Sequence, residues 1–337
     1  MATKIGINGF GRIGRGFLRI LEAREETDLE VVAINDLVGV DNLAYLLKYD
    51  SVHGRFDGTV EVDGNDMIVN GRKIEVTSET DPANLGWDEK DVEIVIESTG
   101  VFRKRDQIAK HLEAGAKRVI LTVPAKDKID ATVVLGVNDD DLDADDEIVS
   151  NASCTTNCLA PLAKALNDEF GIQKGLITTV HGYTATQAVL DAPASKIRRG
   201  RTAAENIIPT TTGAAIATTK VLPELEGKID GKALRVPVPN GSCVDGVFLL
   251  DVEETTVEDV NAALKKKAEG EMKGILGYTE EELVSRDIMG QKESSLIDAK
   301  ATQMVNKNMV KIISWYDNEY SYTNRVIDLA ERMVDML

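Results

Sequence analysis

A cysteine and a histidine are the residues of this chain best suited to covalent chemistry. Cys154 stands in the segment Ser153-Cys154-Thr155-Thr156-Asn157, and His181 is the only histidine that follows it. An apolar strand pattern ends just before this segment and a helical pattern begins in it, which predicts Cys154 in the first turn of a helix. There the helix dipole and a nearby imidazolium favour thiolate over thiol. We therefore predict that Cys154 attacks a carbonyl carbon and that His181 is its base.

The remaining histidines and cysteines predict no metal site. His53 in a predicted loop and His111 on a predicted helix are interpreted as structural. Cys158 lies one helical turn after Cys154, so a site made of both thiols and His181 is conceivable. Closed zinc sites need four ligands, and no fourth residue is spaced to join these three.

A basic stretch, Lys196 to Arg201, stands out in an otherwise acidic chain. A solvated charge run or a subunit contact explains it as well as ligand binding does. Thr184, Arg235 and the turn Thr211-Thr212-Gly213 before a predicted helix add hydroxyls, a cation and backbone amides, which suit phosphate oxyanions. Two anion sites beside a reactive cysteine would indicate a phosphorylated substrate.

The N-terminal segment has the pattern of a dinucleotide site. Gly9, Gly11 and Gly14 lie between a predicted strand and a predicted helix, where the turn and the helix N-terminus can hold a pyrophosphate. The next predicted strand ends at Asp36, at the spacing of an acid that binds ribose hydroxyls. The turns Glu97 to Gly100 and Thr122 to Ala125 follow two later strands and fall on the same carboxyl edge.

The strands and helices predicted to position these residues follow two different patterns along the chain. Short Val/Ile-rich runs alternate with helical patterns through the first 150 residues, which predicts an α/β domain with a doubly wound parallel sheet. Two turn signals, Asp63-Gly64-Asn65 and Asn70-Gly71, predict a small antiparallel excursion within it. After residue 150, longer strands and fewer helices predict an α+β second domain. The periodicity of Tyr322 to Met336 predicts a C-terminal helix.

Composition and charge exclude several classes of protein. At 337 residues the chain is long enough for two domains, and 43% hydrophobic with 28% charged residues is typical of a globular protein. Asp and Glu number 57 against 39 Lys and Arg, so a main role in nucleic-acid binding is not expected. No apolar run could span a membrane, and the N-terminus has no export signal. Three cysteines cannot form a disulfide framework, so we expect a cytoplasmic enzyme.

Four segments together resemble one family, phosphorylating glyceraldehyde-3-phosphate dehydrogenase. They are Asn8 to Arg15, Ser150 to Pro161, Arg201 to Pro209 and Ser314 to Glu319. The resemblance covers essentially the whole chain. It implies a homotetramer of subunits with a Rossmann-type dinucleotide-binding domain, residues 1–152 joined by a C-terminal helix at 317–337, and a catalytic domain at 153–316.

The family chemistry, carried over to this chain, assigns Cys154 as nucleophile and His181 as its ion-pair partner and base. It implies that D-glyceraldehyde 3-phosphate becomes a thioacyl enzyme, which inorganic phosphate converts to 1,3-bisphosphoglycerate, in glycolysis or gluconeogenesis. Residues implied to bind the substrate phosphate or the attacking phosphate are Ser153, Thr155, Thr184, Arg201, Thr212, Gly213 and Arg235.

The resemblance implies NAD as the cofactor. Residues implied to bind it are Gly9, Gly11, Arg12, Ile13, Gly14, Asp36, Thr99, Gly100, Thr122, Asn318 and Tyr322. Ala192 before Pro193 is a departure, because many NAD-dependent members carry Leu there, and the smaller side chain leaves room for the 2′-phosphate of NADP. Asp36 would repel that phosphate, so NAD is favoured, with NADP as the alternative.

Two other functions are alternatives. Erythrose-4-phosphate dehydrogenase shares the thiol, the histidine and the cofactor, but Thr210 to Ala215 is more similar to the triose-phosphate enzyme. A non-catalytic dinucleotide-binding scaffold would have no need of Cys154 and His181. A requirement for inorganic phosphate distinguishes the first alternative, and turnover distinguishes the second.

Overall fold

A computed structural model describes residues 2–336 of the chain. The backbone separates into two units. One comprises Met1–Val133, Asp140–Ala152 and Thr323–Leu337, and the other comprises Val134–Asp139 and Ser153–Tyr322. Each unit is built around its own large sheet.

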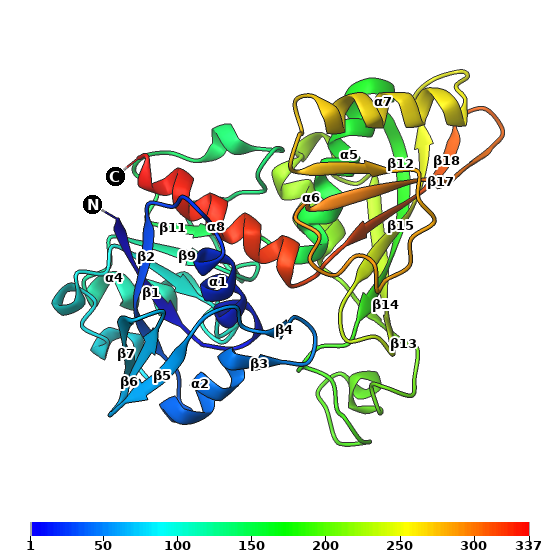
Figure 1. The fold of residues 1–337 in the computed structure, drawn as a ribbon. Helices are drawn as coiled ribbons and strands as arrows, with labels where there is room; N and C mark the ends of the chain where they lie inside the picture. The colour runs from blue at the N-terminus through cyan, green and yellow to red at the C-terminus, as the bar shows by residue number, and fades with distance from the viewer. Residues whose placement is uncertain (1, 337) are drawn as a thin grey trace. The chain divides into compact units, whose positions relative to one another are not determined.

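The sheet of the first unit has nine strands in the order β10-β11-β9-β8-β1-β2-β7-β6-β5 (Figure 1). Its strands are β1 (Thr3–Asn8), β2 (Leu29–Asn35), β5 (Val60–Asp63), β6 (Asp66–Val69), β7 (Arg72–Thr77), β8 (Ile94–Glu97), β9 (Arg118–Leu121), β10 (Ala131–Thr132) and β11 (Ile148–Ser150). Neighbours from β10 to β7 pair in parallel. The central strands are buried on both faces and read as continuous apolar runs, as parallel sheets require. The predicted Rossmann-type α/β class is confirmed.

The helices of this unit lie between these strands and near the C-terminal end of the chain. They are α1 (Arg12–Glu22), α2 (Val40–Lys48), α3 (Arg105–Ile108), α4 (Lys110–Glu113) and α8 (Tyr320–Val334), with 3-10 turns at Pro82–Asn84, Asp88–Lys90 and Asp139–Asp141. The sequence from Gln107 to Ala114 has a helical pattern, but the structure has two single turns on either side of Ala109, whose carbonyl oxygen accepts from the N–H groups of both Leu112 and Glu113. A two-stranded ribbon, β3 (Tyr49–Asp50) and β4 (Gly54–Arg55), follows α2.

The predicted antiparallel excursion forms the edge of this same sheet. Asn70 and Gly71 have φ values of 49° and 79°, the left-handed pair that a two-residue hairpin needs between β6 and β7. β5 and β6 also pair antiparallel. The excursion does not stand apart, because β7 pairs in parallel with β2 and so joins the sheet.

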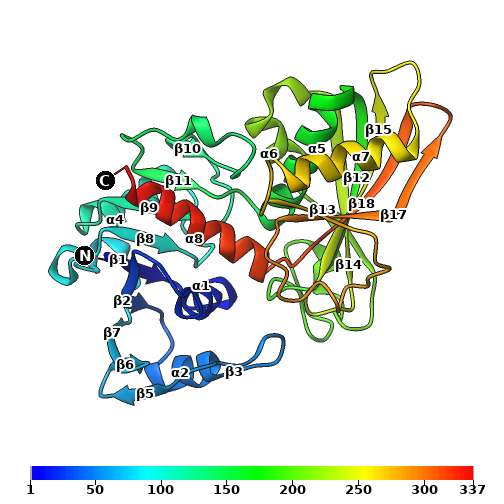
Figure 2. The same cartoon turned by 45° about the horizontal axis from the view of Figure 1, so that its top comes forward.

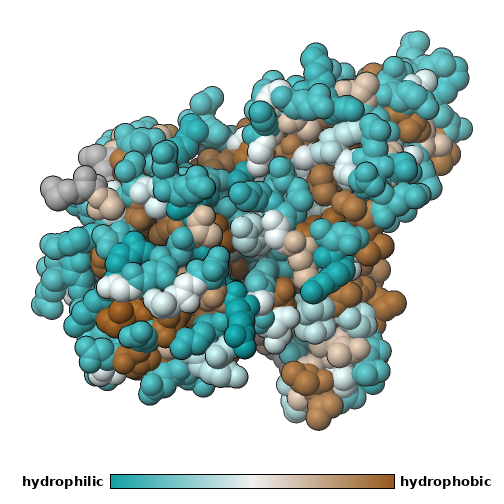
Figure 3. All heavy atoms as spheres, in the orientation of Figure 1, coloured by the Kyte–Doolittle hydropathy of each residue, from teal (hydrophilic) through white to brown (hydrophobic). Residues whose placement is uncertain are grey.

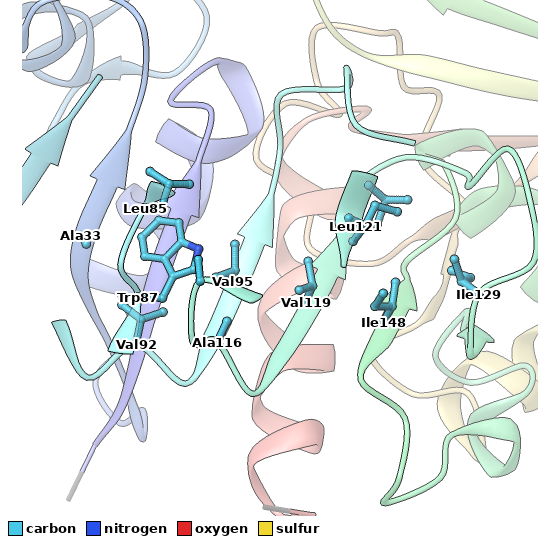
Figure 4. Close-up of a cluster of buried hydrophobic side chains, with 12 residues drawn as sticks. Ala33, Leu85, Trp87, Val92, Val95, Ala116, Val119, Leu121, Ile129 and Ile148 are labelled. Atoms are coloured by element: carbon cyan, nitrogen blue, oxygen red, sulfur yellow. The ribbon is translucent and has the colours of Figure 1, made fainter. Parts of the chain in front are cut away.

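Apolar side chains fill one side of the first sheet beneath α3 and α4. Trp87 is fully buried in this cluster, beside Leu85, Val92 and Val95 (Figure 4). An indole of this size buries about 150–250 Å² in a protein core, so it is a main source of packing energy here. Truncating a buried Trp to Ala typically costs about 3–5 kcal/mol.

The second unit has a seven-stranded mixed sheet in the order β13-β14-β12-β15-β18-β17-β16. Its strands are β12 (Ile172–Gly182), β13 (Ile208–Thr211), β14 (Ile229–Val236), β15 (Ser242–Leu250), β16 (Leu276–Thr279), β17 (Ser295–Val305) and β18 (Met309–Tyr316). Its helices are α5 (Cys154–Phe170), α6 (Ala214–Val221) and α7 (Val257–Glu269), with 3-10 turns at Ile197–Gly200 and Pro223–Leu225. Figure 2 shows these helices gathered on one face of the sheet. Strands that alternate buried and part-exposed residues agree with one covered face.

Hydrophilic residues predominate on the face drawn in Figure 3, in keeping with the formal charge of −18. Within residues 2–336, no helix combines the length and the apolar character that crossing a membrane requires.

Candidate active site

The start of α5 presents Cys154. After β11 the chain turns at Ala152, whose φ is 53°, and Ser153 becomes the N-cap of the helix. Oγ of Ser153 accepts a hydrogen bond from the backbone N–H of Thr156 at 3.1 Å. Cys154 is therefore the first residue of α5, as the sequence predicted.

His181 lies next to this thiol at the end of β12. Its Nε2 is 3.5 Å from Sγ of Cys154. Its Nδ1 lies 2.7 Å from the carbonyl oxygen of Gly182 and can donate a hydrogen bond to it. With the proton on Nδ1, Nε2 is an acceptor that faces the sulfur, which is the tautomer that a base requires.

Arg235 reaches the same imidazole from the neighbouring strand. β12 and β14 pair in parallel with His181 directly opposite Arg235. Nη1 of Arg235 donates to the carbonyl oxygen of Gly182 at 2.9 Å and lies 3.4 Å from Oγ1 of Thr184. A cation, a thiol and an imidazole thus share one half-buried site in the second unit.

Burial controls the electrostatics of this group. It raises the pKa of the Cys154 thiol, while the Arg235 charge and the hydrogen bonds of Thr155 act in the opposite direction. Burial also lowers the pKa of His181 to about 3, and the Arg235 charge adds to that shift. Both shifts favour the uncharged forms, so a thiolate forms here only if Nε2 of His181 takes up its proton, and the ion pair that the family resemblance implies stays a prediction.

Tyr316 completes the site, and no sequence pattern indicated its role, although it lies in the segment Ser314 to Glu319. Its buried hydroxyl lies 2.9 Å from Oγ1 of Thr155 and 2.8 Å from Oγ1 of Thr179. Its ring packs edge-on against the ring of His181, with centroids 5.9 Å apart. Tyr316 thereby fixes both the first turn of α5 and the orientation of the imidazole.

Several residues predicted to bind phosphate lie close together. Thr155 and Thr212 line one small cavity of about 10 Å³ between α5 and α6. Gly213 is the N-cap of α6, where a Cβ would meet no atom within 4 Å. Thr184 and Arg235 form the pair described above. Thr184 and Arg235 therefore lie beside His181, whereas Thr155 and Thr212 line a separate cavity with Ile177 and Lys232.

Arg201 is placed differently from Arg199 in the basic stretch. Nε of Arg201 bonds to Asp191 at 2.9 Å, and its side chain is 62% exposed. Nε of Arg199 instead donates to Oγ1 of Thr210 at 3.1 Å, and its charge contributes to the lowered pKa of His181, after burial and Arg235. Both arginines belong to one basic run, so spacing alone could not choose between them. The contacts of Arg199 make it the better candidate for an anion site beside His181, and the phosphate role of Arg201 stays a prediction.

A cavity of about 380 Å³ opens at the carboxyl edge of the first sheet. Of the predicted cofactor residues, Gly9, Gly11, Asp36 and Thr99 line it. The other lining residues were not among the predicted cofactor residues, although Asn8 and Ser98 lie in segments that the sequence indicated; they are Asn8, Asn35, Leu37, Glu79, Thr80, Ser98, Val101 and Phe102.

The backbone of this cavity suits a pyrophosphate. Gly9 has a φ of 93°, and a Cβ there would lie 2.7 Å from the backbone nitrogen of Thr99. Gly11 is the N-cap of α1, and a Cβ there would meet no atom within 4 Å. In Gly14, a Cβ would lie 2.3 Å from the carbonyl oxygen of Gly9. Gly9 is thus needed for the turn, Gly11 leaves the backbone open to a ligand, and Gly14 allows the helix to pack on the strand.

Asp36 follows β2 at the rim of the cavity. Its Oδ2 accepts from the backbone N–H of Phe10 at 2.8 Å, and its Oδ1 accepts from that of Val38 at 3.1 Å. These bonds fix the carboxylate beside the glycine turn. The arrangement fits a dinucleotide, with the helix N-terminus for the pyrophosphate and the carboxylate for ribose hydroxyls.

The other predicted cofactor residues do not line this cavity. Ile13 lies in the first turn of α1, and Gly100 follows β8 with a φ of 70°. Arg12 is paired with Asp50, and Oγ1 of Thr122 donates to the carbonyl oxygen of Glu97 at 3.1 Å. Asn318 and Tyr322 belong to the second unit, where Asn318 accepts from Ser242 at 2.6 Å. Their roles in cofactor binding stay predictions.

Within residues 2–336, no three His, Cys, Asp or Glu side chains converge in a way that could hold a metal ion.

Comparison with known proteins places both units in one family. The model of the glyceraldehyde 3-phosphate dehydrogenase NAD binding domain matches residues 3–105, and the model of the C-terminal domain of that enzyme matches residues 153–318. The chain is 60% identical to glyceraldehyde-3-phosphate dehydrogenase of Priestia megaterium over 332 residues, and 60% identical to glyceraldehyde-3-phosphate dehydrogenase 1 of Bacillus subtilis over 331. It is 57% identical to glyceraldehyde-3-phosphate dehydrogenase A of Escherichia coli over 330 residues. Each match covers 98% of both chains.

Proposed function

This chain belongs to the glyceraldehyde-3-phosphate dehydrogenase family, and on that premise we propose that Cys154 carries out the phosphorylating oxidation of D-glyceraldehyde 3-phosphate with NAD. The distance of 3.5 Å between Sγ of Cys154 and Nε2 of His181, at the start of a helix, is the observation that carries this proposal. Direct contact between a thiol and an imidazole is what the proposed roles of nucleophile and base require.

The residues of the site suggest the order of events. The Cys154 thiol gives its proton to Nε2 of His181, and the sulfur adds to the aldehyde carbon to form a hemithioacetal. The imidazolium returns that proton to the new oxyanion, which becomes the hydroxyl of the hemithioacetal, and Nε2 is then free to take the hydroxyl proton as hydride leaves the carbon. Bound NAD supplies the hydride acceptor. Attack of inorganic phosphate on the resulting thioester breaks the carbon–sulfur bond, releases 1,3-bisphosphoglycerate and restores the thiolate.

Anion binding follows from the cations and hydroxyls around this pair. We propose that Arg235 and Thr184 bind the phosphate of the substrate, and that Thr155, Thr212 and the N-terminus of α6 bind the attacking phosphate. Arg199 supports one of these sites, since its charge acts on His181 whereas Arg201 is paired with Asp191. Local cations are needed here because the chain as a whole is acidic.

The same premise extends to architecture. We propose residues 1–152 with 317–337 as the dinucleotide-binding domain and 153–316 as the catalytic domain. We also propose a homotetramer, which large exposed apolar side chains support. They lie on the loop drawn below β13 and β14 in Figure 1, a region where Figure 3 shows hydrophobic residues at the surface. These side chains are Val189, Leu190, Ile197 and Ile207. Leu190→Asp should lower the mass measured by light scattering, whereas Val284→Asp, also exposed, should leave it unchanged. Three free cysteines agree with a cytoplasmic location.

A spectrophotometric assay tests the reaction. Purified protein should reduce NAD when glyceraldehyde 3-phosphate and inorganic phosphate are both present, and omitting phosphate should stop multiple turnover. Turnover that does not depend on phosphate would instead indicate hydrolysis of the thioester, as in the erythrose-4-phosphate alternative. Absence of any turnover, with NAD still bound, would favour a non-catalytic scaffold.

A further inference from the structure

Polar side chains join across the carboxyl ends of four neighbouring parallel strands in the first unit. Nδ2 of Asn8 on β1 donates to Oε2 of Glu97 on β8 at 2.6 Å. Nδ2 of Asn35 on β2 donates to Oδ1 of Asn8 at 2.8 Å, and Oγ1 of Thr77 on β7 donates to Oδ1 of Asn35 at 3.0 Å. We call these four residues the edge ladder. The ladder crosses the sheet directly below the cavity assigned to NAD.

A buried histidine and a tryptophan extend the edge ladder into the core. Nε2 of His111 lies 3.0 Å from Oε2 of Glu97, and Nε1 of Trp87 donates to Nδ1 of His111 at 3.1 Å. An indole N–H can only donate, so Nδ1 accepts and Nε2 carries the proton toward Glu97. Glu97 and His111 are both 0% exposed, and the reaction at Cys154 uses neither.

The edge ladder holds two walls of the cavity. On one side, Oε1 of Glu97 accepts hydrogen bonds from the backbone N–H of Thr99, at 2.9 Å, and from its hydroxyl. On the other side, Asn35 accepts from the backbone N–H of Glu79 at 2.8 Å and donates to its carbonyl oxygen at 2.9 Å. Thr99 and Glu79 both line the cavity. A shift of Glu97 would therefore be transmitted to the turn that faces the ligand.

Stability alone does not explain this arrangement. Replacing buried charged and polar groups by well-packed apolar ones is often neutral or stabilising, so a buried carboxylate needs another reason to be there. Here the carboxylate receives four donors from three residues, Asn8, Thr99 and His111, and so fixes the relative positions of two strand ends and one turn. Such fully connected networks rigidify the groups that they join.

We propose that Glu97 and His111 are positioning residues for NAD: together they hold the Thr99 turn and the edge ladder in the shape that binds the cofactor. This inference rests on the NAD site proposed for this cavity. It differs from a direct binding role, because His111 does not line the cavity and reaches it only through its contacts with Glu97 and Asn8.

Titration of the purified enzyme with NAD in a calorimeter, together with steady-state kinetics, tests the inference. We expect His111→Leu to raise both the Kd and the KM for NAD roughly 10- to 100-fold, the worth of a hydrogen bond to a charged group, with kcat at saturating NAD little changed. His111→Gln should restore most of the affinity, since its amide can donate to Glu97 and accept from Trp87. Alkylation of Cys154 should proceed at the wild-type rate in both variants.

Two controls separate positioning from general loss of stability. Thr302→Val breaks a comparable bond in the other unit, where Oγ1 of Thr302 donates to Oδ1 of Asn261 at 2.8 Å. It should lower the melting temperature without changing the Kd for NAD. If folded His111→Leu binds NAD as tightly as wild type, or if Thr302→Val weakens binding equally, the positioning role is wrong. Failure of the wild-type protein to bind NAD would instead overturn the proposed function.

Discussion

Arg235 holds its guanidinium against the side of His181 that faces away from Cys154, with Nη1 3.0 Å from Nδ1. The carbonyl oxygen of Gly182 accepts from both groups, at 2.9 Å from Nη1 and 2.7 Å from Nδ1. This shared acceptor directs Nε2 toward the sulfur. The fixed charge also adds to burial in lowering the pKa of His181, which keeps the imidazole neutral and its Nε2 unprotonated.

Cys154→Ser should reduce turnover by at least about 10³-fold while leaving NAD binding intact, because a hydroxyl is a far weaker nucleophile than a thiolate. The matched control is Cys158→Ser. Burial raises the pKa of Cys158 to about 12, and its Sγ lies 3.6 Å from Oγ of Ser314, so it is not a nucleophile. Assays of both variants decide the assignment, and equal losses of turnover would contradict it.

Arg235→Gln should remove the preference for a phosphorylated aldehyde. We expect kcat/KM for glyceraldehyde 3-phosphate to fall about 10²-fold or more, as expected for loss of a charge-assisted contact, and kcat/KM for unphosphorylated glyceraldehyde to fall much less. Arg201→Gln offers a comparison, since that side chain is exposed and paired with Asp191. A parallel loss on both aldehydes in Arg235→Gln would show that the arginine acts on the thiol–imidazole pair rather than on the phosphate.

Asp36→Asn should shift cofactor preference toward NADP. The amide keeps an acceptor for the N–H of Phe10 or Val38 but no longer repels a 2′-phosphate. We expect the ratio of kcat/KM for NADP to that for NAD to rise about tenfold, the equivalent of roughly 1.4 kcal/mol. Initial rates with both cofactors measure this ratio. An unchanged ratio would mean that Asp36 does not face the ribose.

Asp50→Asn should destabilise the protein in a pH-dependent way. Burial would raise the pKa of Asp50, but the hydrogen bonds from Arg12 and from the N–H groups of His53 and Val52 lower it overall. A depressed carboxyl pKa stabilises the folded state above the unfolded pKa of about 4, and that contribution disappears as pH falls through the folded pKa.

We therefore expect Asp50→Asn to lose about 1 kcal/mol at pH 7, allowing for partial solvent screening, and to approach wild type in acid. Melting temperatures of wild type and Asp50→Asn, measured from pH 7 down into the acid range, provide the test. A gap that stays constant or widens in acid would contradict the ionised pair of Arg12 and Asp50.

The sequence predicted those parts of the site that depend on local order. Strand, glycine turn, helix and acidic strand end follow one another along the chain, so Gly9, Gly11 and Asp36 could be assigned without a structure. Cys154 could be placed in the first turn of α5 because Ser153 is a strong N-cap residue.

The rest depends on strand register and on bends that no short pattern encodes. His181 and Arg235 meet because β12 and β14 are aligned in parallel, and Asn8 meets Glu97 for the same kind of reason. The choice between Arg199 and Arg201 depends on the 3-10 turn at Ile197–Gly200, which directs the two side chains differently.

Ala152 has a left-handed backbone conformation directly before the residue that caps α5. For a residue with a Cβ this conformation costs about 1–2 kcal/mol. Glycine would remove that cost and add only about 0.4–1 kcal/mol to the conformational entropy lost on folding. Thermal stability therefore does not explain why alanine stands here. What the methyl group changes is backbone freedom: with fewer conformations open to the residue before Ser153, the start of α5 keeps a single position in the folded chain.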